Sequence, residues 1–157
     1  MISAKSARFA QGTVAGDQPA DWVASHGCTH GAHRARFADG ARRAIAAGYD
    51  MITIHGAHGY LVSQFLSPHH NQRTDEWGGS AQKRMKFVLE VYRAIRASTN
   101  PDFCVGIKLN SADFQRGGFT EDESLAVIDA LASEGIDLVE ISGGNYENPA
   151  MAKGNSK

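Results

Sequence analysis

The apolar positions of this chain change period several times, and each change marks an expected helix or strand. Over residues 35–47 they recur at helical spacing, and Gly48 supplies the C-terminal stop. Helical spacing returns over about 81–97 and again after the capping pair of Thr120 and Glu123. Short apolar runs separate these helices, and we predict strands at 51–55, 103–109 and 136–141, of which the first is expected to be buried.

Each predicted strand stops at polar residues, among them His55, Lys108 and Ser142. Helix, glycine, aspartate, strand and polar loop follow one another twice, once from Gly48 to Gly56 and once from Gly135 to Gly143. Strands that alternate with helices indicate a parallel sheet, in which all carboxyl ends share one edge. We therefore expect these three side chains on one rim, where ligands bind in α/β folds.

The loop after the first of these strands carries the densest candidate chemistry. His55 is followed within five residues by His58 and Tyr60, with Gly56 and Gly59 between them. Two imidazoles and a phenol are groups that donate hydrogen bonds and protons near neutral pH. A long polar excursion off a strand end is typical of a functional loop.

The fold class that this pattern predicts is α/β, as a partial (β/α)₈ TIM barrel of about three central βα units. A complete barrel needs about 250 residues, and this chain has 157. We expect a fragment whose strand edges are open to self-association. The expected division is an atypical, poorly ordered arm at 1–34, a partial barrel domain at 35–148 and a tail at 149–157.

Composition narrows the class of partner. The formal net charge is −1 and the sequence pI is near 6.6, with no long run of one sign, so neither nucleic acid nor a membrane surface is indicated. A small-molecule substrate and a cytoplasmic location are the expectations. The two cysteines have no metal-type spacing, and the arm's histidines and cysteine match no structural zinc pattern, at His26, Cys28, His30 and His33.

The residues from about Phe37 to Tyr146 resemble a known family. The block HGAHGYLVSQFLSPHHNQRTDEWGGS is similar to the active-site block of the Old Yellow Enzyme family, and VGIKLNSADFQRGGFTEDES and LVEISGGNYE are similar to its next two βα units. These are FMN-dependent NAD(P)H:flavin oxidoreductases with (β/α)₈ barrels. The resemblance implies hydride transfer from NAD(P)H through FMN to an activated C=C bond. It does not extend to residues 1–34, and the clustered cysteines of iron–sulfur relatives are missing.

The resemblance also assigns roles by position. His55 and His58 match the pair that hydrogen-bonds the acceptor's activating oxygen, and Tyr60 matches the proton donor. Lys108 stands where the family carries a basic residue near the flavin N1 and C2 carbonyl, so it is the expected cofactor-binding residue. A further motif is expected to shape the loop, at Arg73, Asp75, Gly78 and Gly79.

Two other readings stay open. In the first, the chain is a truncated, catalytically inactive polypeptide that cannot retain FMN, because one basic residue does not replace the many contacts that bind a cofactor. In the second, His55 and His58 form a zinc half-site of a metal-dependent barrel hydrolase. Each site residue also has a plain structural alternative, such as a packed aromatic ring for Tyr60 or a solvated charge for Lys108.

Overall fold

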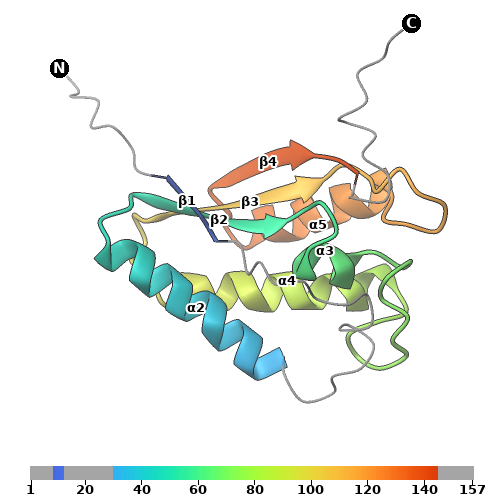
Figure 1. Cartoon of the computed structure of the whole chain (residues 1–157), viewed down its shortest axis with the longest axis horizontal. Helices are drawn as coiled ribbons and strands as arrows, with labels where there is room; N and C mark the ends of the chain where they lie inside the picture. Colours follow the sequence, from blue (N-terminus) through green and yellow to red (C-terminus); the bar gives the residue numbers. More distant parts are fainter. Residues whose placement is uncertain (1–8, 13–29, 145–157) are drawn as a thin grey trace, which may run out of the picture.

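The computed structural model describes residues 9–12 and 30–144, over which strands and helices alternate as the apolar pattern predicts (Figure 1). The strands are β1 (Phe9–Gly12), β2 (Met51–Gly56), β3 (Cys104–Asn110) and β4 (Leu138–Ser142). The helices are α2 (His30–Ala46), α3 (Leu61–Leu66), α4 (Ala81–Arg96) and α5 (Glu121–Ser133).

The strands form one parallel sheet in the order β1-β2-β3-β4, so neighbours in the chain are also neighbours in space. This order is that of a section of a (β/α)₈ barrel wall. In the register, Lys108 lies opposite His55 on one side and opposite Glu140 on the other, and Asn110 lies opposite Ser142. The predicted parallel sheet is confirmed, and its carboxyl ends share one rim.

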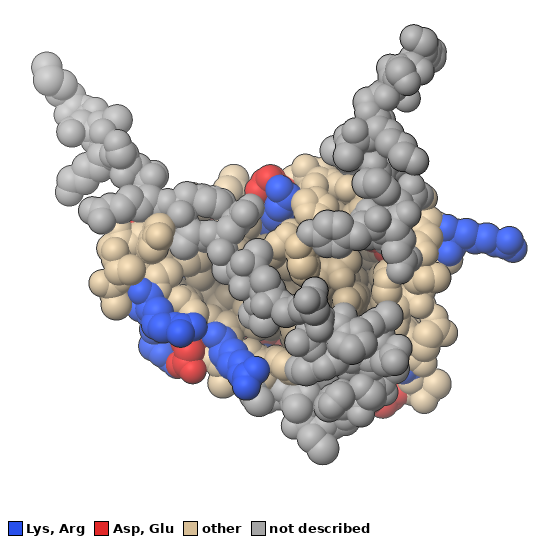
Figure 2. Space-filling model, in the orientation of Figure 1, with Lys and Arg blue, Asp and Glu red and all other residues tan. Residues whose placement is uncertain are grey.

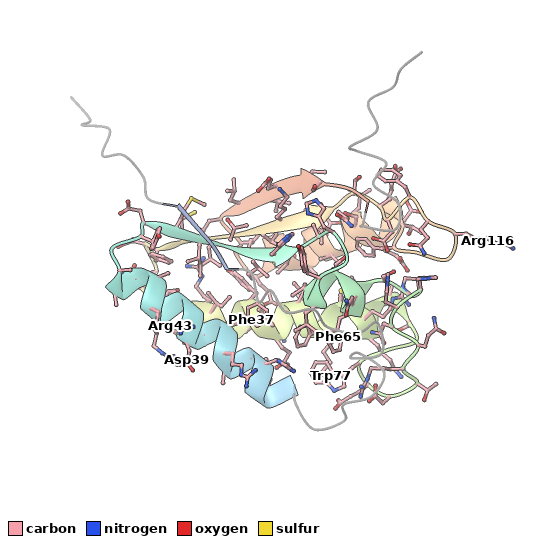
Figure 3. The ribbon with its side chains drawn as sticks, viewed as in Figure 1. Phe37, Asp39, Arg43, Phe65, Trp77 and Arg116 are labelled. Carbon is pink, nitrogen blue, oxygen red and sulfur yellow. The ribbon has the colours of Figure 1, made fainter. Side chains whose placement is uncertain are left out.

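The apolar core lies between the sheet and the four helices, which all lie on the same side of it (Figure 1). Phe65 of α3 stacks on Phe87 of α4 with ring centroids 4.1 Å apart, and Figure 3 shows Phe65 and Trp77 on this helix side. Burying such a side chain contributes about 1.5–3 kcal/mol. The central strands add Ile52, Ile54, Val105, Ile107 and Leu109.

Local signals set the ends of several elements. The Ser80 hydroxyl accepts from the Lys83 amide and caps α4, and Thr120 with Glu123 forms the predicted capping box of α5. Gly48 and Gly135 have φ of 80° and 88°, which a side chain would strain. Both helices that precede these glycines end in the same pair of backbone hydrogen bonds, in which the glycine amide and the next amide bond back into the last turn.

The structure adds elements that the apolar pattern did not indicate. The apolar pattern predicts no regular element before residue 35, yet β1 pairs with β2 and α2 begins at His30. The sequence FAQG of β1 shows no alternation of apolar and polar residues, so the pattern could not predict this strand. Its place in the sheet depends on backbone pairing with β2. The remainder of the expected arm, 1–8 and 13–29, and the expected tail at 149–157 lie outside the described residues.

The last strand begins two residues later than its predicted start. Ile136 donates its amide to the Leu131 carbonyl and so completes the end of α5. The Asp137 amide donates to the Val105 carbonyl at 3.1 Å, and its carboxylate accepts from the Val105 amide at 2.8 Å. These bonds place Asp137 beside the start of β3, and the regular strand follows at Leu138.

Charged side chains on the visible surface are concentrated on α2, as Figure 2 shows. Arg36, Arg42 and Arg43 are exposed there, and Asp39 pairs with Arg42. Arg116 projects away from the molecule in the β3–α5 loop (Figure 3). Exposed ion pairs of this kind add little stability. In the described part of the chain, no helix combines the length and apolar character needed to cross a membrane.

Candidate functional site

The face of the sheet opposite the core carries the polar side chains of the strands, and no helix covers it within residues 9–12 and 30–144 (Figure 1). Side chains alternate between the two faces of a strand. Residues in register therefore share a face, so the face that carries His55 also carries Lys108 and Glu140. The polar positions of three separate strand ends are thus brought into one row.

The loop after β2 makes a tight turn that gathers the expected catalytic groups. Gly56 leaves room for a close backbone approach, because a Cβ there would lie 3.0 Å from the Lys108 carbonyl oxygen. His58 has φ of 60° and Gly59 has φ of 81°. The turn ends where the Tyr60 carbonyl accepts from the Gln64 amide at 2.8 Å and starts α3.

The three rings of this loop lie against one another. The His55 ring centroid lies 5.3 Å from that of His58, with the rings nearly perpendicular, and 4.8 Å from that of Tyr60. His55 is therefore the middle ring of the cluster. Its Nδ1 is buried and has no hydrogen-bond partner among the described residues. The structure thus brings together all three residues that the sequence analysis expected to be catalytic.

Two hydrogen bonds with residues at the ends of other strands hold His58. Its backbone amide donates to Asn110 Oδ1 at 3.3 Å, and its Nε2 lies 2.6 Å from Ser142 Oγ. Asn110 is 1% exposed and donates through Nδ2 to Asp113 Oδ1 at 3.1 Å and to the Gly144 carbonyl at 2.8 Å. His58 is thus anchored to the ends of both β3 and β4.

Electrostatics keep both imidazoles neutral. Burial lowers the pKa of His55 from its usual value, the charges of His58 and Lys108 lower it further, and Glu140 acts in the opposite direction. The pKa of His58 is lowered by burial and then by Lys108, again with Glu140 opposing. A neutral imidazole has one N–H donor and one acceptor nitrogen. Near pH 7 each ring therefore offers a single N–H.

Lys108 is paired with a residue that the sequence analysis did not single out. Its Nζ donates to Glu140 Oε1 at 2.8 Å, across the register of β3 and β4. An ammonium has three donors, so two remain for other groups. The signal in the sequence is an acid inside an otherwise apolar strand, but only the strand register shows that it faces Lys108.

The loop between α3 and α4 has the geometry expected of a shape-determining motif. Arg73 pairs with Asp75, whose Oδ1 accepts from the Trp77 amide at 3.0 Å. A Cβ on Gly78 would lie 2.4 Å from the Arg73 carbonyl oxygen, so a side chain there would force the loop to move. Gly79 has φ of 87°, which favours glycine.

Metal ligation was the alternative for the histidines. Within residues 9–12 and 30–144, no group of three or more His, Cys, Asp or Glu side chains is placed to hold a metal ion. His26 and Cys28 of the arm lie outside the described residues, and His33 is buried on α2.

Comparison with known proteins identifies flavin oxidoreductases as relatives of this chain. The sequence profile of the NADH:flavin oxidoreductase / NADH oxidase family matches residues 31–153. An NADH-dependent flavin oxidoreductase of Aspergillus parasiticus is 46% identical over 117 residues, which cover 74% of this chain and 25% of that protein. An NADPH dehydrogenase of Geobacillus thermodenitrificans is 42% identical over 108 residues, covering 69% and 31%. The chain spans less than a third of the length of these two relatives.

Solved structures agree on the architecture. A 2-naphthoyl-CoA reductase in complex with 2-naphthoyl-CoA aligns with a TM-score of 0.74 and 31% identity, over 76% of this chain and 18% of that one. An old yellow enzyme homologue from Zymomonas mobilis aligns with a TM-score of 0.67 and 22% identity, over 76% and 36%, which shows the fold. The predicted partial (β/α)₈ barrel is confirmed, and the chain belongs to the NADH:flavin oxidoreductase / NADH oxidase family.

Proposed function

We propose that this chain carries the acceptor-binding and proton-donating segment of an FMN-dependent oxidoreductase that reduces an activated C=C bond with NAD(P)H. The observation that carries the proposal is the ring cluster at the end of β2, where His55 lies 5.3 Å from His58 and 4.8 Å from Tyr60. Family membership supports the same chemistry. In this proposal the two histidines stabilise negative charge on the acceptor oxygen, and Tyr60 donates a proton to the α carbon.

The two histidines stabilise developing negative charge. When hydride adds to the carbon β to a carbonyl, negative charge develops on the carbonyl oxygen. Neutral imidazoles with one N–H each, held at the strand rim, are donors that need little reorganisation at that moment. His58 is held through both its backbone amide and its ring, so its donor is preorganised.

Tyr60 supplies the proton that completes the reduction. The product enolate needs a proton at its α carbon, and a phenol with an ordinary pKa near 10 stays protonated at neutral pH. It can therefore act as a general acid when the carbon lies within reach. The 4.8 Å distance between the ring centroids of Tyr60 and His55 supports this role, because it keeps the phenol near the groups proposed to bind the oxygen.

The residues present fit a flavin on the polar face of the sheet. Lys108 projects from that face, and its ammonium keeps two donors after the bond to Glu140. We propose that these donors hold the N1 and C2 carbonyl edge of the isoalloxazine. On the same face, the buried Nδ1 of His55 has no hydrogen-bond partner among the described residues. FMN, when bound, supplies the hydride.

A second candidate function follows from the exposed apolar residues of β4. Leu138, on the same face as Glu140, is 44% exposed, and Ile141, on the opposite face, is 52% exposed. β4 is also the last strand of the sheet within the described residues. In this alternative the chain is catalytically inactive by itself, does not retain FMN, and associates with another chain along β4.

Flavin retention separates the two candidates. The purified chain is mixed with FMN and passed through a gel-filtration column, and the visible and far-UV circular dichroism spectra are recorded. The proposed function expects a retained flavin band, lost in Lys108→Met and kept in Arg116→Met, which removes an exposed charge in the β3–α5 loop. A folded chain without a flavin band, eluting as an oligomer, would support the second candidate.

A further inference from the structure

The backbone of His58 adopts a conformation that is uncommon for residues other than glycine. Its φ is 60°, in the left-handed region. Such a residue persists only when its surroundings hold it there. The hold comes from the side chain of Asn110, which is 1% exposed and accepts from the His58 amide while its own amide group donates to Asp113 and Gly144. With the backbone fixed in this way, the placement of the ring depends on its own contacts.

The ring of His58 is hydrogen-bonded to Ser142 at the end of β4, where Nε2 and Oγ lie 2.6 Å apart. A serine hydroxyl can either donate or accept, and the two cases put the ring proton on different nitrogens. This bond occupies Nε2, so Nδ1 is the ring nitrogen left for another group. A neutral ring that donates through Nδ1 must accept through Nε2, and in that case Ser142 is the donor.

If Nε2 accepts, the single proton of the neutral ring resides on Nδ1. The lowered pKa of His58, caused by burial and by Lys108, supports the neutral form near pH 7. His55 differs from His58 in its ring contacts. Its Nδ1 is buried without a hydrogen-bond partner among the described residues. A buried donor without an acceptor is costly, so His55 is expected to carry its proton on Nε2. The two rings would then present different nitrogens as donors.

We propose that Ser142 is a positioning residue that keeps the ring proton of His58 on Nδ1, so that Nδ1–H is the donor offered to the oxygen of the acceptor. The last clause rests on the proposed function. The first rests on it as well, because the donor role of His58 decides which nitrogen carries the proton, but the tautomer can be measured without FMN or an acceptor. Ser142 acts through His58 and need not touch the acceptor.

Nitrogen-15 NMR of the histidine-labelled chain reads the tautomer directly, because protonated and unprotonated ring nitrogens have widely separated shifts. In the unaltered chain near pH 7.5 we expect an unprotonated Nε2 and a protonated Nδ1 for His58, assigned by the loss of its signals in His58→Asn. In Ser142→Ala the proton should move toward Nε2, the form that free neutral histidine prefers in water. Ser142→Thr keeps the hydroxyl and should restore the Nδ1–H form.

The signals of His55 serve as an internal reference and should keep their tautomer in both Ser142 variants. A protonated Nε2 on His58 in the unaltered chain would overturn the assignment, whatever the variants do. An unchanged tautomer in a folded Ser142→Ala variant would also overturn it. The spectra need neither FMN nor acceptor, so this result and the flavin-retention result can fail independently.

Discussion

The two copies of the internal repeat fold alike at their turns and differ in their surroundings. Gly48 before β2 and Gly135 before β4 have the same left-handed φ and the same helix-ending hydrogen bonds. Ile54 and Ile141 are at matching positions, yet Ile54 is 2% exposed and Ile141 is 52% exposed. β2 lies between β1 and β3, whereas β4 pairs only with β3 among the described strands. Similar local sequence therefore produces a similar turn, while burial depends on what lies beside the strand.

The chemistry at the two strand ends differs in the same way. The end of β2 carries the titratable ring cluster of His55, His58 and Tyr60, and the end of β4 supplies Ser142, which contacts that cluster through His58. One copy of the repeat thus holds the proposed catalytic groups and the other positions them. Substitutions at paired positions can test this division.

The largest effect is expected from Tyr60→Phe, if a flavin-loaded enzyme is obtained. Removing a general acid lowers the rate of the step that it serves by about 10²–10⁴-fold. Stopped-flow absorbance should show slow reoxidation of the flavin by an enone, with an unchanged rate of flavin reduction by NAD(P)H. Ser142→Ala should slow the same step by a smaller factor, because it acts through His58. Equal slowing of both half-reactions by Tyr60→Phe would contradict the proton-donor role.

Truncation of the matched isoleucines should lower the free energy of unfolding much more in β2 than in β4. Ile54→Ala creates a cavity in the core and should cost about 2–5 kcal/mol. Ile141→Ala removes an exposed side chain and should change stability by less than about 0.5 kcal/mol. Urea denaturation followed by circular dichroism measures both. A similar loss for Ile141→Ala would show that β4 is covered in solution, as association along this strand would require.

Substitution of either glycine should lower stability by the same amount, in contrast to substitution of the isoleucines. Gly48→Ala and Gly135→Ala each place a Cβ in the left-handed region, at a cost of about 1–2 kcal/mol. Space is not the limit at Gly135, where the nearest atom to an added Cβ is the Tyr92 hydroxyl at 3.9 Å. Thermal or urea unfolding of the two variants should therefore give matching losses. Clearly unequal losses would show that the repeats differ in their turns as well as in their burial.

The smallest expected effect is a pH dependence of stability caused by the two histidines at the end of β2. The folded pKa values of His55 and His58 lie below their ordinary value, so the unfolded chain binds more protons at mildly acidic pH. Their contribution is complete above the unfolded pKa of about 6.5 and decreases as the pH falls toward the folded values. Urea unfolding between pH 7.5 and mildly acidic pH should show this decline. A His55→Asn, His58→Asn double variant should show a shallower one, and an equal slope would contradict the lowered pKa values.

Local signals in the sequence predicted much of this fold because they act within one turn or one strand. The capping pair of Thr120 and Glu123 and the glycines at 48 and 135 mark helix ends through bonds that span at most five residues. The apolar runs predicted the strands β2, β3 and β4. The block from His55 to Ser80 indicated the family and the candidate site, since its residue types and spacing are read directly from the chain.

Tertiary structure alone decided which residues separated in the chain meet. The bond of Lys108 to Glu140 spans 32 residues, that of His58 to Asn110 spans 52 and that of His58 to Ser142 spans 84, and each depends on the register of neighbouring strands. The pairing of β1 with β2 likewise left no periodic trace in the sequence FAQG. A periodic pattern shows which face of a strand is apolar, but the neighbour of that face is set by packing of the whole sheet.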